Sequence, residues 1–157
     1  MARYAYEGNT RVWWVPSISN IAAPTTAEIG AGTDLTPFVP KDGIQRPSTQ
    51  NMVDSATIKE TFDAQGVGSW GGSLQMTFFR DASADTAWNL CVYGTAGYIV
   101  IRDGVTVATA ATAGQKVEVY PAQMHEPVMA QTAANEQARF TEMFAVTAQP
   151  NKKATLA

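Results

Sequence analysis

Short runs of alternating apolar and polar residues recur along the chain, and most are bounded by proline, glycine or a polar cluster. Such runs predict β-strands, because successive side chains of a strand point to opposite faces of a sheet. Aromatic and β-branched residues strengthen several of these predictions. The predicted strands cover residues 10–15, 58–62, 73–79, 98–102, 105–109, 116–120 and 138–147.

Two of these strands carry additional information. The dipeptide Asp103-Gly104 joins two predicted strands and is a strong signal for a β-hairpin. The last predicted strand has apolar side chains on both faces, and Glu142 falls on the face that Phe140 and Phe144 share. Such a strand is best explained if both of its faces are covered.

Helical signals are few. Ser83 is a suitable N-cap for one short helix, which Gly94 can close, and the apolar residues between them recur at helical spacing. Thr25 and Glu28 have the spacing of a capping box inside a connection rich in proline, threonine and glycine, so a single helical turn is expected there.

These elements predict a mainly β fold, in one domain over residues 1–157: an antiparallel β-sandwich or partly open barrel with one short α-helix. Residues 41–57 show no clean period and contain Pro47, so we expect a long loop or an extended arm. Residues 148–157 form a C-terminal tail that we expect to be mobile. No internal repeat or domain boundary is visible.

Composition narrows the class of protein. Of the 157 residues, 45% are hydrophobic and only 16% charged, which favours a surface that partners bury. The formal net charge of −3 lacks the basic character needed to grip nucleic acid through its phosphates. Without a leader-like N-terminus or a run of about 18 apolar residues, we expect neither export nor a membrane span.

The stretch GVGSWG at residues 66–71 matches the spacing G-x-G-x-x-G of dinucleotide-binding proteins. That motif requires a helix N-terminus directly after it to hold the phosphates. Here the alternating residues 73–79 follow and predict a strand. We therefore interpret the stretch as a glycine-rich connection between two strands.

Catalytic and metal-binding patterns are also weak. Asp81, Ser83 and Asp85 match the first ligand positions of a calcium-binding loop, but the glycine and the glutamate that such a loop needs later are absent. His125 is the only histidine and has no nucleophile in a recognisable context. Cys91 lies in an apolar patch, where a buried and inert thiol is expected. We predict no catalytic residue, no metal site and no cofactor.

Taken in order, four parts of the chain resemble the tail tube (major tail) proteins of long-tailed bacteriophages. The opening strand and its connection (TRVWWVPSISNIAAPTTAEIGAGTDLTPFV) come first, and VDSAT at residues 53–57 is the second part. The third is GSWGGSLQMTFFRD with the helix ADTAWNL and the strand GYIVIRDG, and the fourth is the pair KVEVYPAQM and ARFTEMFAVTAQP. The resemblance therefore covers nearly the whole chain.

The resemblance implies a non-enzymatic structural protein of the virion tail, assembled in the host cytoplasm. Six copies would form a ring whose inner sheets join into one barrel, and stacked rings would form a tube that conducts DNA without binding it specifically. Its partners would be itself and other tail proteins (tape measure, terminator and tail tip), with no membrane. A mildly acidic wall would let DNA slide.

Two sets of candidate residues follow from this interpretation. The candidates for acidic groups facing the lumen are Asp54, Glu60, Asp63, Glu118 and Glu142. The candidates for an arm that reaches a neighbouring ring are Gln45, Arg46, Pro47, Asn51, Met52 and Val53.

Two alternatives stay open at this point. The chain could be a small β-sandwich module that binds a carbohydrate or peptide through an exposed Trp13 or Trp70. It could also be another ring-forming tail protein, such as a tail terminator.

Overall fold

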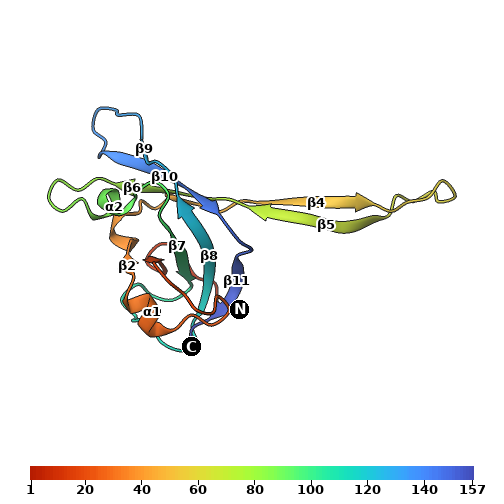
Figure 1. Cartoon of the computed structure of the whole chain (residues 1–157), viewed down its shortest axis with the longest axis horizontal. Helices are drawn as coiled ribbons and strands as arrows, with labels where there is room; N and C mark the ends of the chain where they lie inside the picture. The colour runs from red at the N-terminus through yellow and green to blue at the C-terminus, as the bar shows by residue number, and fades with distance from the viewer.

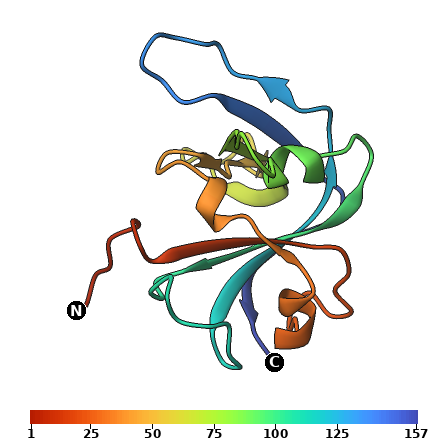
Figure 2. The same ribbon diagram turned by 90° about the vertical axis from the view of Figure 1, so that its left-hand side faces the viewer.

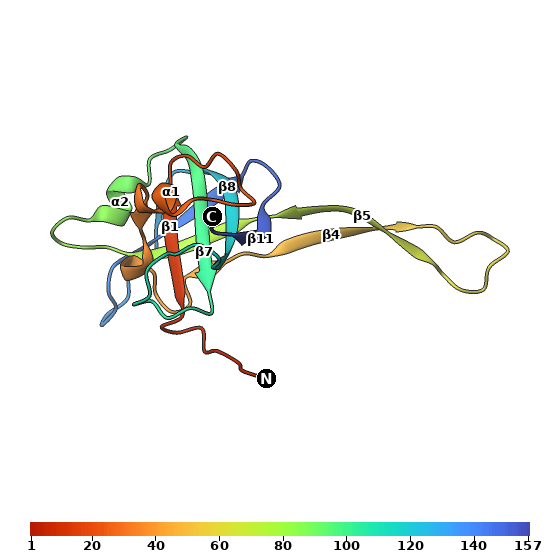
Figure 3. The same cartoon turned by 90° about the horizontal axis from the view of Figure 1, so that it is seen from below.

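The computed structural model describes residues 1–157 and shows a β-rich body from which a long two-stranded arm projects (Figures 1 and 3). We define the arm as residues 48–72. The elements are β1 (Thr10–Val15), α1 (Thr26–Gly30), β2 (Thr33–Asp34), the 3-10 helix η1 (Thr36–Phe38), β3 (Ile44–Gln45), β4 (Ser48–Asp54), β5 (Gln65–Gly72), β6 (Leu74–Phe79), α2 (Thr86–Leu90), β7 (Ala96–Asp103), β8 (Lys116–Met124), β9 (Val128–Met129), β10 (Arg139–Val146) and β11 (Asn151–Thr155).

The body is built on one open antiparallel sheet. Its nine strands follow the order β2-β1-β7-β8-β10-β6-β3, with β11 also paired to β8 and β9 also paired to β10. Viewed along the long axis of the molecule, these strands curve around the interior (Figure 2). The mainly β, antiparallel fold is confirmed. The sheet does not close into a barrel in the single subunit.

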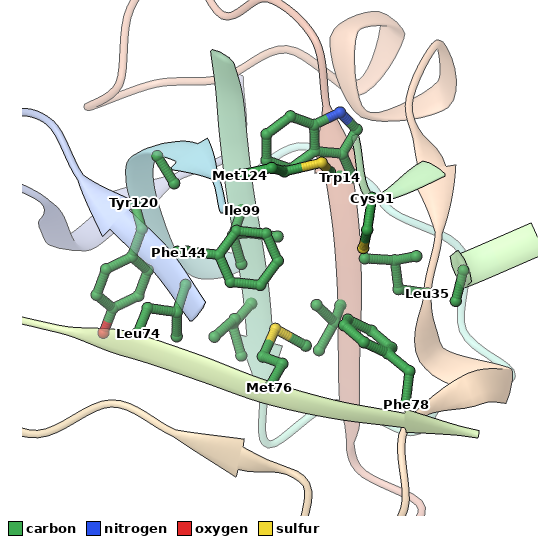
Figure 4. Close-up of a cluster of buried hydrophobic side chains, with 14 of the residues drawn as sticks. Trp14, Leu35, Leu74, Met76, Phe78, Cys91, Ile99, Tyr120, Met124 and Phe144 are labelled. Atoms are coloured by element: carbon green, nitrogen blue, oxygen red, sulfur yellow. The ribbon is translucent and has the colours of Figure 1, made fainter. Parts of the chain in front are cut away.

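Both faces of β1, β7 and β8 are covered, because alternate side chains enter two different cores. In β1, Val12 and Trp14 point into the larger core while Trp13 and Val15 point into the smaller one. Figure 4 shows side chains of the larger core from β1, β6, β7, β8 and β10 turned toward one another. Phe78 stacks on Phe140 there, with the ring centroids 5.3 Å apart.

The smaller core lies on the opposite face of the sheet. It is formed by Trp13, Val15, Ile18, Ile29, Val100, Val117, Val119, Ala154 and Leu156. Helix α1 contributes Ile29 and begins with the predicted capping box. The Thr25 hydroxyl accepts the Glu28 N–H, and the Glu28 carboxylate accepts the Thr25 N–H. The N–H groups of Thr25 and Ser19 both donate to the Glu28 carboxylate and hold the pKa of Glu28 below its ordinary value.

The structure therefore has two short α-helices where the strongest sequence signal predicted one. Each is five residues long, and no helix of the structure has the length and apolar character to cross a bilayer. Helix α2 also begins later than predicted: Asp85, with φ of +47°, is the N-cap and makes no side-chain capping bond. Its carboxylate instead accepts hydrogen bonds from Arg80 and from the Asp81 N–H.

The predicted strand at residues 105–109 is wrong. Gly104 does turn the chain, with φ of +80°, but no returning strand follows. The reason is the fully buried Arg102, whose guanidinium donates hydrogen bonds to the carbonyl oxygens of Thr106 and Thr109. These carbonyls solvate a buried cation and do not join a β-ladder, and β7 pairs with β1 and β8 instead.

The expectation of a mobile C-terminal tail is also wrong. Residues 151–155 form β11, which pairs with β8 at Val117 and Val119, and Ala154 and Leu156 are buried in the smaller core. Without β11, the first half of β8 would expose an unpaired edge, because β10 pairs only with its last three residues. The tail therefore completes both the sheet and the smaller core.

Candidate assembly surface

The arm is an antiparallel hairpin that stands apart from the body (Figures 1 and 3). Its strands pair from Ser48 opposite Gly72 to Asp54 opposite Gln65, and every residue of β4 is exposed. A two-stranded ribbon is marginally stable by itself in water. The segment expected to be a long loop or arm therefore supplies one strand of a protruding hairpin.

The glycine stretch at residues 66–71 supplies the other strand and is not a connection between strands. At Gly68 the two strands approach so closely that a Cβ atom would lie 2.6 Å from the Asn51 carbonyl oxygen. The register also shifts between Gln50 and Met52, which marks an irregularity in the ladder at this point. Glycine is required there because any side chain would collide with the opposite backbone.

Large apolar side chains are exposed along the arm. The exposed fraction is 67% for Met52, 78% for Phe62 and 99% for Val67, and Val53 and Ile58 are also exposed. Exposed apolar groups gathered on one projecting element are typical of surfaces that bind a protein partner.

The end of the arm, residues 55–64, is a turn region, so the predicted strand at 58–62 is wrong. Local hydrogen bonds shape it: the Ser55 hydroxyl donates to the Ala64 carbonyl, and the Glu60 carboxylate accepts the Thr57 N–H. Such side-chain bonds satisfy the backbone in turns and compete with strand pairing. This is why loose alternation there did not produce a strand.

The candidate arm residues fall into two groups. Asn51, Met52 and Val53 lie exposed on β4. The others lie where the arm meets the body: Gln45 ends β3, opposite Gln75 of β6, and Arg46 and Pro47 separate β3 from β4.

The five acidic candidates do not gather on one surface. Asp54, Glu60 and Asp63 are exposed on the arm, whereas Glu118 on β8 is half-buried and paired with Arg46. Glu142 has no exposed surface, so its proposed place on the lumen wall is wrong for the subunit. It shares the inward face of β10 with Phe140 and Phe144.

Burial determines the chemistry of Glu142. Removal from water raises the pKa of its carboxyl group to about 7, and the His125 N–H, 2.7 Å from Oε1, partly offsets this effect. The group therefore changes charge near neutral pH inside the larger core.

This burial predicts that the free energy of unfolding falls as the pH rises from about 4.5 to about 7. In that range the folded protein keeps the Glu142 proton while the unfolded chain, with the ordinary value of 4.5, releases it. This stabilisation is fully present below the pKa of Glu142 in the unfolded chain and is lost as the pH rises through its pKa in the folded protein. It amounts to about 3 kcal/mol at most. Urea unfolding from pH 4 to 8 measures it.

Glu142→Gln should remove most of this dependence and be more stable than the natural protein at pH 8. Glu136→Gln, at an exposed position that does not contribute to the pKa shift of Glu142, is the matched control and should keep the original slope. An unchanged slope in Glu142→Gln would show that another group is responsible.

The outer face of β10 is not covered within the single subunit, so the structure of one chain does not test the expected cover on that face. Met143 is 59% exposed, and Ala145 is exposed beside it. Since Phe140 and Phe144 fill the larger core from the other face, the strand is covered on one side only.

The structure also shows where the remaining reactive and aromatic candidate residues lie. Cys91 is buried as predicted, and burial raises the pKa of its thiol to about 12, which makes it a poor nucleophile. His125 is exposed and meets the Tyr93 ring edge-on. No group of three or more histidine, cysteine or acidic side chains is placed to hold a metal ion. Trp13 is buried and cannot present a ligand platform, whereas Trp70 is 43% exposed.

Comparison with known families decides the class of this protein. The sequence model of the family described as "Phage tail tube protein" matches residues 1–157. The chain belongs to the phage tail tube protein family. It is therefore a structural component of the virion tail and not an enzyme, as the resemblance implied. Membership also implies that this tail tube protein associates with copies of itself and with other tail proteins.

A solved structure shares the fold of this tail tube protein. It is a chain of the cryo-EM structure of the anti-feeding prophage (AFP) baseplate, 6-fold symmetrised, with a TM-score of 0.59 and 13% sequence identity. The match covers 96% of each chain, so the arm and the body are both within its extent. No curated protein matches the sequence.

Proposed function

We propose that this tail tube protein forms rings of six subunits that stack into a hollow tube, the conduit for DNA during ejection. The observation that carries the proposal is the arm, an element of the subunit with exposed apolar side chains and no residue in either core. The six-fold symmetry of the assembly that contains the similar AFP chain supports the number of subunits.

The arm is the proposed contact with a neighbouring ring, through Asn51, Met52 and Val53 on β4. The seven residues of β4 alone span about 23 Å, enough to cross a subunit boundary. An arm that binds a different surface on the next copy makes a heterologous contact, which generates rings or filaments. The uncovered face of β10 and the open sheet edges supply further surface for joining the inner sheets into one barrel.

We also propose that the wall of the channel is mildly acidic, with Asp54, Glu60, Asp63 and Glu118 as candidates and Glu142 now left out. Carboxylates repel phosphate, so DNA slides along the wall and does not bind it specifically. Tape measure, terminator and tail tip proteins are the expected partners at the ends of the tube and inside it. Assembly takes place in the host cytoplasm.

Electron microscopy tests this proposal. Purified protein at increasing concentration, and virions that contain it, should show tubes with a central channel and six subunits per ring. Single rings that never stack would favour a tail terminator instead. Persistent monomers, together with tails that lack the protein, would overturn the proposal, and saturable binding on a glycan array would favour the ligand-binding module.

A further inference from the structure

The junction between arm and body is weakly held by the backbone. Strand pairing stops on both sides of it: β3 ends at Gln45, β4 begins at Ser48, and Ser73 interrupts β5 and β6. One backbone hydrogen bond spans the gap, from the Ser73 N–H to the Pro47 carbonyl at 3.1 Å. The adjacent Gly71 and Gly72 have no side chains to resist bending. The backbone by itself therefore leaves the direction of the arm free to vary.

Arg46 fastens this junction to the body. One of its terminal nitrogens donates to Asp103 Oδ2 at 2.7 Å and the other to Glu118 Oε2 at 2.9 Å. The Arg46 side chain is only 26% exposed, and charge-assisted bonds in partly buried places are stronger than those on an open surface. The two carboxylates belong to neighbouring strands, so the guanidinium spans β7 and β8.

Hydroxyl groups hold both carboxylates in position for Arg46. The Thr10 hydroxyl donates to Asp103 Oδ1 at 2.7 Å, and the Tyr120 hydroxyl donates to Glu118 Oε2 at 2.8 Å. The two carboxylates that accept from the guanidinium are thus held by hydroxyl groups of β1 and β8, without any contribution from the arm. A fixed pair of acceptors allows one orientation of a planar guanidinium.

A second cation, Lys152 on β11, contacts both strands of the arm. Its ammonium group donates to the Ser48 hydroxyl of β4 at 2.6 Å and lies over the Trp70 ring of β5, 5.6 Å from the centroid. Lys152 reaches the arm from β11, whereas Arg46 lies at the base of the arm and reaches β7 and β8. Two attachments from separate strands define a direction, which one attachment does not.

We propose that Arg46 and Lys152 are positioning residues that hold the arm at one angle to the body and thereby set where it meets a second copy of the chain. The inference rests on the proposed function. A tilt of about 15° at the junction displaces the far end of β4 by about 6 Å, since that strand is about 23 Å long. This exceeds the roughly 4 Å within which apolar side chains make contact.

The direction of the arm can be measured in the single subunit by pulsed electron spin resonance. Nitroxide labels on Gln65→Cys, at the far end of β5, and on Thr112→Cys, in the body, report the distance between arm and body. Both positions are exposed. Cys91 is buried and should not react with the label, and labelling of the protein without added cysteines tests this. The natural sequence should give one narrow distance distribution.

The double variant Arg46→Met, Lys152→Met should at least double the width of that distribution. Arg46→Lys, which keeps the charge but not the two-pronged contact, should be intermediate. Lys153→Met is the matched control for Lys152→Met, because the Lys153 side chain is exposed and makes no hydrogen bond or ion pair. An unchanged width in the double variant would overturn the proposal.

Tube formation supplies the second measurement. The concentration needed for tubes should rise at least tenfold in the double variant and stay unchanged in Lys153→Met. A broad distribution with normal assembly would refute the link between arm angle and contact. Failure of the natural protein to form tubes would instead count against the proposed function, and the spin-label distances would still decide whether the two cations hold the arm.

Discussion

A subunit in which residues 48–72 are replaced by Asn-Gly is expected to fold and to form no tubes. The arm contributes no residue to either core, and Pro47 and Ser73 already lie within a hydrogen bond of each other, so a two-residue turn can join them. Removing the arm removes most of the exposed apolar surface proposed to bind the next copy. Circular dichroism and thermal unfolding report folding, and electron microscopy reports tubes.

Substitutions at the end of the arm test whether its apolar side chains are needed for assembly when the arm itself is still present. Ile58→Ser with Phe62→Ser should raise the concentration needed for tubes at least tenfold, because both side chains are exposed and gain stability only when a partner covers them. Lys59→Ser with Thr61→Ser changes the same turn without removing apolar surface and is the matched control. Tubes of normal length from the arm-less subunit would rule out the arm as a contact.

Leu156→Ala is expected to lower the free energy of unfolding by about 2–5 kcal/mol, as for other truncations of buried leucine. The side chain is 2% exposed and packs in the smaller core. For a chain of this size the loss corresponds to a fall in Tm of roughly 5–15 °C. Differential scanning calorimetry of the free subunit measures the change.

Lys153→Ala is the control for this prediction, because Lys153 lies on the same terminal segment and is exposed. Its effect on the free energy of unfolding should stay within about 0.5 kcal/mol. Equal and small effects of the two substitutions would mean that the terminal segment is not part of the folded core in solution.

Strands that bury one face could be predicted from the sequence. In β6, Leu74, Met76 and Phe78 are buried and alternate with more exposed residues, so the sequence shows the two-residue period of a strand. The capping box of α1 could also be predicted, since it depends on two residues at a fixed spacing. In these cases local chemistry and the tertiary environment require the same residues.

The arm could not be predicted in this way. Both faces of β4 meet solvent in the subunit, so nothing imposes an alternation of apolar and polar residues. Its partner β5 is rich in glycine, which normally counts against a strand, but Gly68 is required by the approach of the Asn51 carbonyl. The glycine at position 68 is thus explained by a contact with the opposite strand, which the sequence of β5 alone does not reveal.

The buried position of Glu142 could have been predicted from the sequence. Glu142 falls on the same face of β10 as Phe140 and Phe144, and that periodicity already placed it in the core. The prediction of an outward carboxylate followed from residue type, because glutamate is seldom buried. The pairing of Glu118 with Arg46 joins residues 72 positions apart, and no local pattern reveals such a contact.

The divided edge of β8 has a consequence for biosynthesis. β10 covers one half of that edge, and the other half is filled only by β11, the last strand of the fold. A nascent chain therefore has an open edge and an unfinished smaller core until residues 151–156 have left the ribosome. Because Lys152 on β11 also contacts the arm, a chain cut before β11 would lack this contact along with Ala154 and Leu156 of the smaller core. The covering of the β8 edge and this contact with the arm thus depend on the same strand.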